Sequence, residues 1–400
     1  MSNEFKLPNK KAVIFWPVGT GDSTTLILKP GEIVAQIDLR HLEKADNQEE
    51  PEWPIIDNLV KILPKKSNGR PYLALFILTH PDQDHIQGFA ELMRRVDIGE
   101  IWHTPKIFRD QPNQEEICQE AKDFRKEADR RRKAILSSPY AIKSGDRLRI
   151  IGHDEILQED KYKNLPAMCK SRPGEKIEYV DGNNLTNHFQ AFVHAPFKDD
   201  LAKDKNNTSL SLNIVVWEGE KFAQFIFLGD REYPSIKKIF EVTESTKGMV
   251  IDNTPYLYWD VMLCAHHCSK AAMYWQEQGD ASEVFKKNIM DYFEKYSRNK
   301  NGYIVASSHA DFSDEEGKNP PHAKARKCYE AIIKPGHFIC THEYPTEQAP
   351  SPTVFIIDGA GLALDDKRSK SQDLSGLTGV VAAARGGTQP PSTQVGFGKI

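Results

Sequence analysis

Short apolar runs separated by turn residues dominate the first forty positions of the chain. Residues 12–16, 23–28 and 33–37 each have the length and β-branched or aromatic content of a strand, and Gly-rich or Pro-Gly turns separate them. This pattern predicts a β-meander that opens a sheet.

The rest of the chain mixes strand and helix patterns. Further strands are predicted over residues 72–78, 98–103, 148–151, 189–194, 209–217, 222–228, 261–265 and 303–307. Apolar residues at helical spacing predict helices over residues 53–63, 86–95, 233–242, 281–296 and 322–333. This order favours a layered α/β protein with helices on the outside.

Residues 113–136 are dense in alternating charge and lack a strong apolar stripe, which predicts a surface helix within a helical insertion at about 104–145. Its basic side chains either form a solvated helix face or follow a phosphate backbone. They are Lys122, Arg125, Lys126, Arg130, Arg131, Arg132 and Lys133. Residues 366–400 turn to Ser, Gly, Gln and Pro, which predicts a flexible C-terminal tail or a docking arm.

Composition adds few constraints on the partner. A hydrophobic content of 39% supports a sizeable core, while 53 basic and 57 acidic residues give a net charge of -4, which does not indicate nucleic-acid binding. The first seven residues lack a signal-peptide core and no apolar run is long enough for a membrane span, so we expect a cytoplasmic protein without a membrane partner. The six cysteines are expected to be reduced thiols, with Cys268 either packed or a metal ligand.

The densest chemistry follows the apolar run 72–78. His80, Asp82, Asp84 and His85 place two imidazoles and two carboxylates within six positions. A cation would offset the repulsion between the carboxylates and hold the side chains together, so the segment predicts a metal site. The alternative is an Asp-rich turn in which Asp84 only caps the following helix.

Two later strand ends supply complementary ligands. Residues 225–229 run into Asp230, and residues 261–265 run into His266 and His267. Either element alone is common in turns or in packing. Three such strand ends in one chain predict a centre for two metal ions.

The order and spacing of these motifs resemble the metallo-β-lactamase superfamily, and within it the branch typified by the hydrolase domain of the competence protein ComEC. The resemblance covers most of residues 11–360. The matching elements are Gly19-Thr20-Gly21-Asp22-Ser23, Ile37-Asp38, the His-x-Asp-x-Asp-His segment from His80 to His85, Asn206-Asn207-Thr208, Gly229-Asp230 and Ala265-His266-His267-Cys268-Ser269. In the last element, Ala265 and Cys268 stand where the branch has glycine.

The resemblance implies an αββα sandwich, two mixed β-sheets flanked by helices, as a hydrolase domain over residues 1–365. It also implies two divalent ions, zinc or manganese, bridged by Asp230, with Asp84 and His267 in catalytic roles. The implied metal ligands are His80, Asp82, Asp84, His85, Asp230, His266 and His267. Residues implied in orientation or substrate contact are Asp22, Asp38, His194, Asn207, Ser269, Lys270 and His322.

Some of these roles have alternatives. The superfamily's third histidine for the first metal falls near Asn206 or Asn207, with His194 the nearest imidazole. Asp38 is expected to orient a ligand histidine. His322 either contacts the site or caps a helix.

Three functions remain open at this stage. The first is a nuclease or phosphodiesterase that acts on DNA, in DNA processing or defence against foreign DNA. The second is a hydrolase of a small ester, phosphoester or lactone. The third is a regulatory metal-binding module that binds a protein partner through the insertion or the tail, because fold alone does not fix function.

Overall fold

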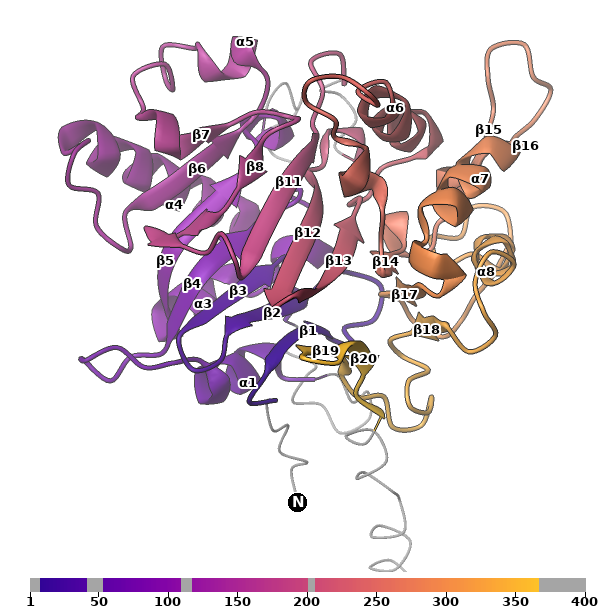
Figure 1. Ribbon diagram of the computed structural model, residues 1–400, viewed down its shortest axis with the longest axis horizontal. Helices are drawn as coiled ribbons and strands as arrows, with labels where there is room; N and C mark the ends of the chain where they lie inside the picture. Colours follow the sequence, from indigo (N-terminus) through magenta and orange to yellow (C-terminus); the bar gives the residue numbers. More distant parts are fainter. Residues whose placement is uncertain (1–7, 42–52, 109–116, 201–205, 367–400) are drawn as a thin grey trace, which may run out of the picture.

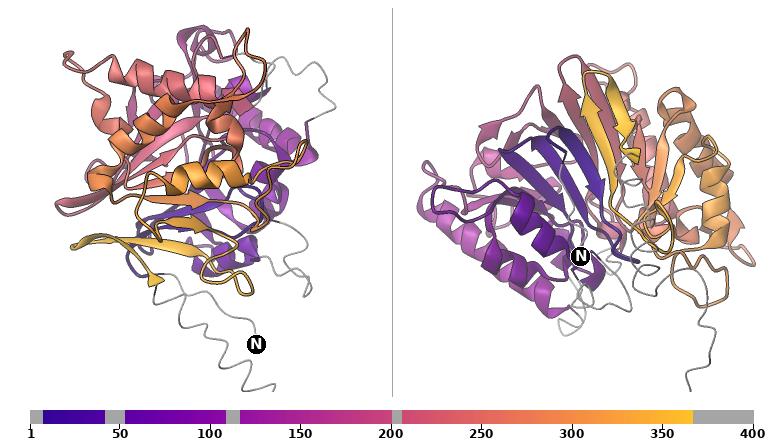
Figure 2. Two further views of the ribbon diagram at one scale, coloured as in Figure 1. Left: turned by 90° about the vertical axis from the view of Figure 1, so that its right-hand side faces the viewer. Right: turned by 90° about the horizontal axis from the view of Figure 1, so that it is seen from below.

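Two mixed β-sheets face each other, and helices cover the outer surface of each (Figures 1 and 2). This architecture is seen in a computed structural model that describes residues 8–41, 53–108, 117–200 and 206–366. The predicted tail therefore lies almost entirely outside the described residues.

The first sheet has the strand order β20-β19-β1-β2-β3-β4-β5-β6-β7. Its strands are β1 (Lys11–Phe15), β2 (Thr24–Lys29), β3 (Ile33–Ile37), β4 (Tyr72–Ile77), β5 (Asp97–His103), β6 (Arg147–Ile151), β7 (Lys170–Ser171), β19 (Thr353–Asp358) and β20 (Gly361–Leu364). Pairing is antiparallel from β20 to β3 and parallel from β3 to β7. Because β3 and β4 are parallel, Asp38 and Thr79, just beyond their ends, lie at the same edge.

The second sheet has the order β18-β17-β14-β13-β12-β11-β8. Its strands are β8 (Lys176–Ile177), β11 (Phe189–Ala195), β12 (Ser211–Glu218), β13 (Lys221–Phe227), β14 (Val261–Leu263), β17 (Tyr303–Ala306) and β18 (Phe338–Cys340). Strands β13, β14, β17 and β18 are parallel, so Asp230 and the histidine pair emerge at one edge. Two small hairpins pair β9 (Tyr179–Val180) with β10 (Asn183–Asn184) and β15 (Tyr274–Trp275) with β16 (Val284–Phe285).

Helices pack on both outer faces. The first sheet carries α1 (Ile55–Ile62), α3 (Phe89–Arg95) and α4 (Gln119–Ser137), and the second carries α6 (Tyr233–Glu244), α7 (Lys287–Tyr296) and α8 (Ala323–Glu330). Shorter segments are α2 (Gln83–Ile86), α5 (Asp154–Leu157), η2 (Pro105–Phe108), η4 (Ala167–Cys169), η5 (Asn206–Thr208), η6 (Thr254–Leu257), η7 (Ala265–His267), η8 (Lys270–Ala272) and η9 (Arg298–Lys300).

Apolar side chains from both sheets fill the space between them. Phe15 and Phe355 of the first sheet pack with Phe189, Leu212 and Phe225 of the second, and all are buried. Separate apolar clusters join each sheet to its own helices. The predicted sandwich of two mixed sheets flanked by helices is therefore confirmed.

The charged segment forms α4 as expected, but one face of that helix is buried. Ala121, Phe124, Ala128, Arg131 and Ile135 recur at spacings of three and four residues and face inward. Two alanines and an arginine make this stripe hard to recognise in the sequence. The helix lies between the parallel strands β5 and β6 in the chain, which is the place of a crossover helix of the first sheet.

All eleven predicted strands have counterparts in the structure, and the C-terminal strands β18, β19 and β20 were not predicted. The helix predicted over residues 281–296 is wrong in its first part, because Val284 and Phe285 form β16 and α7 begins at Lys287.

Each of the six cysteines is a free thiol. Within the described residues, no helix has the length and apolar character needed to cross a bilayer.

Candidate metal centre

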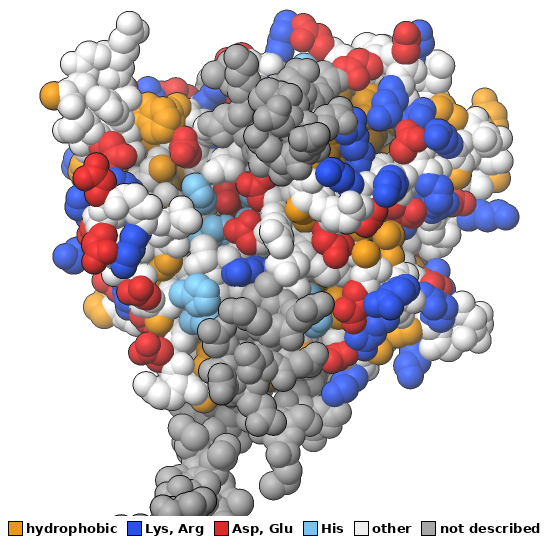
Figure 3. Space-filling view, turned by 180° about the vertical axis from the view of Figure 1, so that it is seen from behind, with side chains coloured by type: hydrophobic (Ala, Val, Ile, Leu, Met, Phe, Trp, Pro, Cys, Tyr) orange, Lys and Arg blue, Asp and Glu red, His pale blue; other side chains and the backbone are white. Residues whose placement is uncertain are grey.

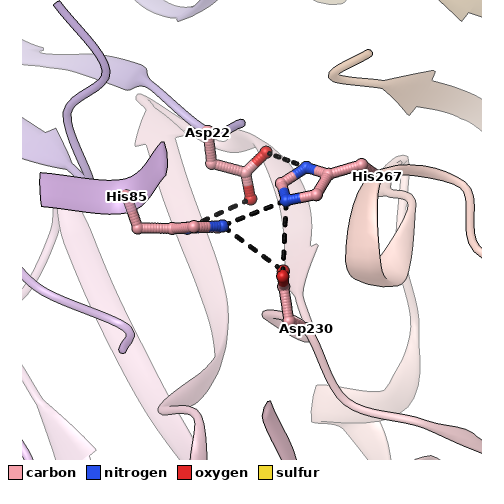
Figure 4. Close-up of side chains that lie close together, drawn as sticks. All are labelled: Asp22, His85, Asp230 and His267. Atoms are coloured by element: carbon pink, nitrogen blue, oxygen red, sulfur yellow. Dashed lines mark hydrogen bonds and ion pairs between the residues drawn. The ribbon is translucent and has the colours of Figure 1, made fainter. Parts of the chain in front are cut away.

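The ends of strands from both sheets converge on a group of histidines and aspartates. On the face shown in Figure 3, histidine and acidic side chains lie side by side near the middle of the molecule. Figure 4 shows four of these side chains, Asp22, His85, Asp230 and His267, pointing toward one another from separate elements. All four are buried, and their ligand atoms lie within 4.8 Å of one another.

One half of the centre is formed by His85, His267 and Asp84. The Nε2 atoms of the two imidazoles are 3.1 Å apart. Asp84 Oδ2 lies 3.3 Å from His267 Nε2 and 3.9 Å from His85 Nε2. Asp84 is 34% exposed, so it is the member of this half that reaches the rim of the site.

Asp230 lies between this half and a second group of histidines. Its Oδ1 is 3.5 Å from His85 Nε2, and its Oδ2 is 3.3 Å from His267 Nε2. The same Oδ2 is 3.4 Å from His80 Nε2 and 3.8 Å from His266 Nε2. A single carboxylate therefore faces imidazole nitrogens of both groups, as a bridging ligand would.

Asp38 orients the histidines of both halves. Its Oδ2 lies 2.8 Å from His85 Nδ1, which leaves His85 Nε2 directed at Asp230. Thr79 Oγ1 donates to Asp38 Oδ2 at 2.5 Å and lies 3.0 Å from His80 Nδ1. Carboxylate–histidine contacts of this kind fix the ring and tautomer of metal-ligating histidines. Asp38 contacts His85 as an orienting residue would, and the contact of Thr79 with both Asp38 and His80 was not predicted from the sequence.

Asp22 faces the Nδ1 side of His267, as Asp38 faces the Nδ1 side of His85. Its Oδ1 lies 3.5 Å from His267 Nδ1, and its backbone N–H donates to the carbonyl oxygen of Asp84 at 3.1 Å. Asp22 thus joins the β1–β2 turn to the segment that carries the clustered ligands. The Gly-Asp-Ser turn was the sequence signal for this contact.

The charges of the centre are strongly coupled. Burial opposes ionisation of Asp230, yet the surrounding histidines hold the pKa of its carboxyl well below the ordinary value. Burial likewise disfavours the cationic imidazole, but Asp230 raises the pKa of both His85 and His267 well above the ordinary value. The carboxylates therefore stabilise positive charge at the Nε2 atoms of these two histidines.

The residues present fit divalent metal ions. His80 Nε2 and Asp230 Oδ1 are buried without a hydrogen-bond partner, which is costly unless a cation takes that place. Imidazole and carboxylate together suit zinc and manganese. Two groups of ligand atoms converge, one of Asp22, His85, Asp230 and His267 and one of Asp38, His80 and His85. Since Asp22 and Asp38 face the Nδ1 atoms, we assign them to orientation and the other side chains to ligation.

The loop that carries the histidine pair is strained and tightly held. His266, His267 and Cys268 have φ values of 47°, 51° and 66°, in the left-handed region that glycine tolerates best. His322 anchors this loop, because its backbone N–H donates to Cys268 O at 3.1 Å and its Nδ1 accepts from Lys270 N–H at 3.2 Å. His322 is the N-cap residue of α8 but makes no capping hydrogen bond through its side chain.

Ser269 and Lys270 hold the loop rather than approach the ligands in this structure. Ser269 Oγ accepts from Ala271 N–H at 3.2 Å. Lys270 Nζ pairs with Glu283 at 2.7 Å. Cys268 is fully buried in the apolar cluster that joins the second sheet to its helices, which favours packing over ligation.

The structure does not bring His194 to the centre. Its Nε2 lies 3.0 Å from Tyr256 O and its Nδ1 lies 3.3 Å from Thr243 Oγ1, so both ring nitrogens are engaged beside α6 and η6. Its position on β11 explains this, because the ring shares a face with Phe192, whereas Val193 faces the other sheet. A third histidine ligand at this position is therefore contradicted.

Asn207 and Asp82 have other structural positions than the clustered histidines and aspartates. Asn207 Oδ1 accepts from the N–H of Glu232 at 3.1 Å, which ties the Asn-rich turn to the segment after Asp230. Asp82 is partly exposed and is the N-cap residue of α2, without a capping hydrogen bond from its side chain. The helix-capping alternative for Asp84 does not hold, because Asp84 lies within α2 and faces the histidines.

Solved structures with the metallo-β-lactamase fold are similar to this chain. The metallo-β-lactamase fold protein YhfI from Bacillus subtilis is 12% identical in sequence to this chain. The match covers 86% of this chain and 99% of that chain, with a TM-score of 0.37. The subclass B3 metallo-β-lactamase BJP-1 of Bradyrhizobium japonicum is 16% identical, with coverages of 73% and 89% and a TM-score of 0.31. CmlA, a diiron β-hydroxylase from Streptomyces venezuelae, is 11% identical, with coverages of 88% and 55% and a TM-score of 0.40. No family model and no curated protein matches.

Proposed function

We propose that this chain is a binuclear metal-dependent hydrolase that cleaves phosphodiester bonds, with DNA as its substrate. The observation that carries the proposal is the position of Asp230 between two groups of imidazole nitrogens, at 3.3 to 3.8 Å from each. The ComEC-like order of the motifs supports DNA as substrate and a role in DNA processing or defence.

Each side chain has a defined part in this proposal. Asp230 would be shared by the two ions, His85, His267 and Asp84 would hold one ion, and His80, His266 and Asp82 would hold the other. Such ions would lower the pKa of water from ~15.7 to about 7 and would stabilise charge on both the attacking and the leaving oxygens. Burial raises the pKa of Asp84, but the neighbouring His85 and His267 outweigh this effect and lower the pKa, so the partly exposed carboxylate is ionised at the rim.

The donor set favours manganese or zinc as the physiological ion. Carboxylates supply several of the ligand positions, and oxygen ligands shift a site toward harder ions. Histidine nitrogens keep zinc competitive. Metal content is therefore part of the test.

A small ester or phosphoester is the second candidate substrate, and the charge pairing on α4 favours it. Five of the basic residues of α4 pair with carboxylates of the same helix. They are Lys126, Arg130, Arg131, Arg132 and Lys133. Such pairing reduces the positive potential available to a DNA backbone.

The test is metal-dependent cleavage by the purified protein. Bound metal is quantified, and cleavage of single- and double-stranded DNA is assayed with manganese or zinc in the wild type, Asp84→Ala and Asp230→Ala. We expect both variants to lose at least about 100-fold in kcat, because each removes a group from the reaction centre. Asp291→Ala changes an exposed aspartate of α7 and serves as the matched control.

Three outcomes separate the candidates. Cleavage lost in Asp84→Ala and Asp230→Ala but kept in Asp291→Ala supports the nuclease. Two bound ions with no DNA cleavage, but turnover of bis(p-nitrophenyl) phosphate or a simple ester, moves the small-substrate hydrolase ahead. A protein that binds neither ion contradicts the proposal.

A further inference from the structure

Arg40 lies against the glycine turn that leads into Asp22. Its Nη1 donates to the carbonyl oxygen of Val18 at 2.9 Å and also to that of Thr20. Arg40 Cδ and Asp84 Cβ both lie within 3.0 Å of the point that a Cβ of Gly21 would occupy. Any side chain at Gly21 would therefore displace Arg40 from its place beside a proposed metal ligand.

Two histidines from distant parts of the chain border the same turn. His309 follows β17, and its Nε2 lies 2.5 Å from the point that a Cβ of Gly19 would occupy, while Arg40 Nη1 lies 3.2 Å from that point. His342 Nε2 accepts from the N–H of Gly19 at 2.7 Å and its ring packs edge-on against His309. The two glycines thus let a guanidinium and an exposed imidazole approach each other closely.

The charge of Arg40 is not neutralised within this arrangement. Among the described residues, no carboxylate oxygen lies within 4.0 Å of its guanidinium, and its acceptors are backbone carbonyls. Its Nε is buried without a hydrogen-bond partner. Carbonyl acceptors fix the direction of a guanidinium without cancelling its charge, which leaves it suited to an anion, since charged hydrogen bonds to arginine are strong and directional.

This group is continuous with the metal centre. Asp22 directly follows the glycine turn and hydrogen-bonds through its N–H to Asp84 O at 3.1 Å, and Ser307 Oγ donates to Gly21 O at 2.5 Å. Figure 3 shows a basic side chain near the central acidic and histidine side chains, with a further group of histidines beside it. An anion held here would lie next to the ions rather than between them.

We propose that Arg40 and His309 form a subsite for a phosphate group of the substrate adjacent to the phosphate that is cleaved. This inference rests on the proposed function and names the feature of the substrate that the centre recognises: a second phosphate one nucleotide from the scissile bond. His342 positions the subsite by holding Gly19. A substrate with a single phosphate would gain nothing from Arg40.

The test compares three dithymidine probes with a phosphorothioate linkage, which slows hydrolysis. One carries a 5′-phosphate, one a 3′-phosphate and one neither, and their affinities are measured by calorimetry with metal-loaded and chelator-treated protein. We expect one of the phosphorylated probes to bind the loaded wild type about 10- to 100-fold more tightly than the unphosphorylated probe, as one charged hydrogen-bonding partner provides. Arg40→Gln should abolish this preference and His309→Gln should reduce it.

Arg125→Gln is the matched control. Arg125 lies on α4, and none of the carboxylates in the described residues forms an ion pair with it, so its loss removes the same charge elsewhere. Metal content and the midpoint of thermal unfolding, measured for every variant, reveal any general damage to the turn. If Arg40→Gln does not fold, Arg40→Lys and His309→Gln carry the test, since the lysine keeps the charge and His309 is exposed.

The outcomes distinguish this inference from the proposed function. A terminal-phosphate preference that Arg40→Gln removes supports the subsite, even if no nucleic acid is cleaved and the phosphodiesterase proposal fails. A preference that is equal in wild type and Arg40→Gln overturns it, because the metals then hold the terminal phosphate. Absence of any preference in the loaded wild type overturns it as well.

Discussion

The Nδ1 atom of His85 lies 2.8 Å from Oδ2 of Asp38, and this contact fixes the direction of the other ring nitrogen. The same carboxylate accepts from Thr79, which in turn contacts His80. One buried aspartate therefore orients a histidine in each half of the proposed centre. Asp230 lies on the Nε2 side of the histidine rings in both halves, and Asp38 lies on the Nδ1 side.

Replacing Asp38 with asparagine should weaken metal binding. Asparagine tolerates the positive φ of 51° at this position, so the backbone should persist while the charge is lost. Loss of such an orienting carboxylate costs about 10- to 100-fold in metal affinity. Metal titration followed by calorimetry checks this expectation.

Asp181→Asn is the control for that experiment. Asp181 is also buried with a positive φ, of 45°, but it pairs with Tyr72 and Arg147 away from the centre. An equal loss of metal affinity in both variants would mean that Asp38 has no specific role.

Thr79 can be tested by size-matched changes. Thr79→Val removes the hydroxyl that joins Asp38 to His80, and Thr79→Ser keeps it. We expect the valine variant to lose about tenfold in affinity for one of the two ions, as other losses of orienting contacts do, and the serine variant to bind both. Two-site titrations of the two variants measure this difference in metal affinity. Equal affinities in both variants would mean that the Thr79 hydroxyl does not contribute to metal binding.

Removal of metal should lower thermal stability. A ligand that binds only the folded state stabilises it by about 2.7 kcal/mol at a concentration 100-fold above Kd. Chelation should therefore lower the midpoint of thermal unfolding by several degrees, and added manganese or zinc should restore it. Asp230→Asn should abolish the metal-dependent shift, whereas Asp291→Ala should retain it. A wild type unaffected by chelation would argue against bound ions.

His194 should affect stability at acid pH rather than metal binding. Burial lowers its pKa to about 4, below the ordinary value of 6.5. Between these values only the unfolded state binds the proton, so the contribution of the neutral imidazole is complete above pH 6.5 and is lost as the pH falls toward 4. His194→Gln should reduce the pH slope of the unfolding free energy by up to about 1.4 kcal/mol per pH unit, at unchanged metal content. Urea unfolding from pH 4 to 7 measures it, and a slope equal to the wild type's would contradict the assignment.

Substitutions of Cys268 test the backbone strain in the loop that carries His266 and His267. Both Cys268→Gly and Cys268→Ala remove the buried thiol, but only glycine is at ease at a φ of 66°. The glycine variant should be more stable than the alanine variant by about 1 kcal/mol. Denaturant unfolding of the pair measures this difference. An alanine variant at least as stable as the glycine variant would show that the loop relaxes at little cost.

The ligand-bearing strand ends could be recognised from the sequence because each follows an apolar strand directly. His80, Asp230 and His267 stand just beyond predicted strands, and parallel pairing brings such ends to one edge. The side of the strand was harder to predict. His194 belongs to a strand with both faces buried, so alternation did not reveal that its ring points to α6.

Contacts between distant segments could not be read from spacing. Arg40 and His309 are separated by most of the chain and meet only because Gly19 leaves room for both. The buried stripe of α4 was equally hidden, because Ala121, Ala128 and Arg131 do not register as apolar anchors in a charged segment. In both cases, the role of the residues depends on tertiary packing and cannot be predicted from the local sequence pattern.

The left-handed run from His266 to Cys268 also bears on how the protein responds to metal shortage. Without cations, mutual repulsion among ligand atoms and an unfavourable backbone act on the same few residues. Local opening should then begin here, ahead of global unfolding, and should show as faster amide hydrogen exchange and new proteolytic cleavage around residues 264–272. Metal supply would in this way set the lifetime of the polypeptide as well as its activity.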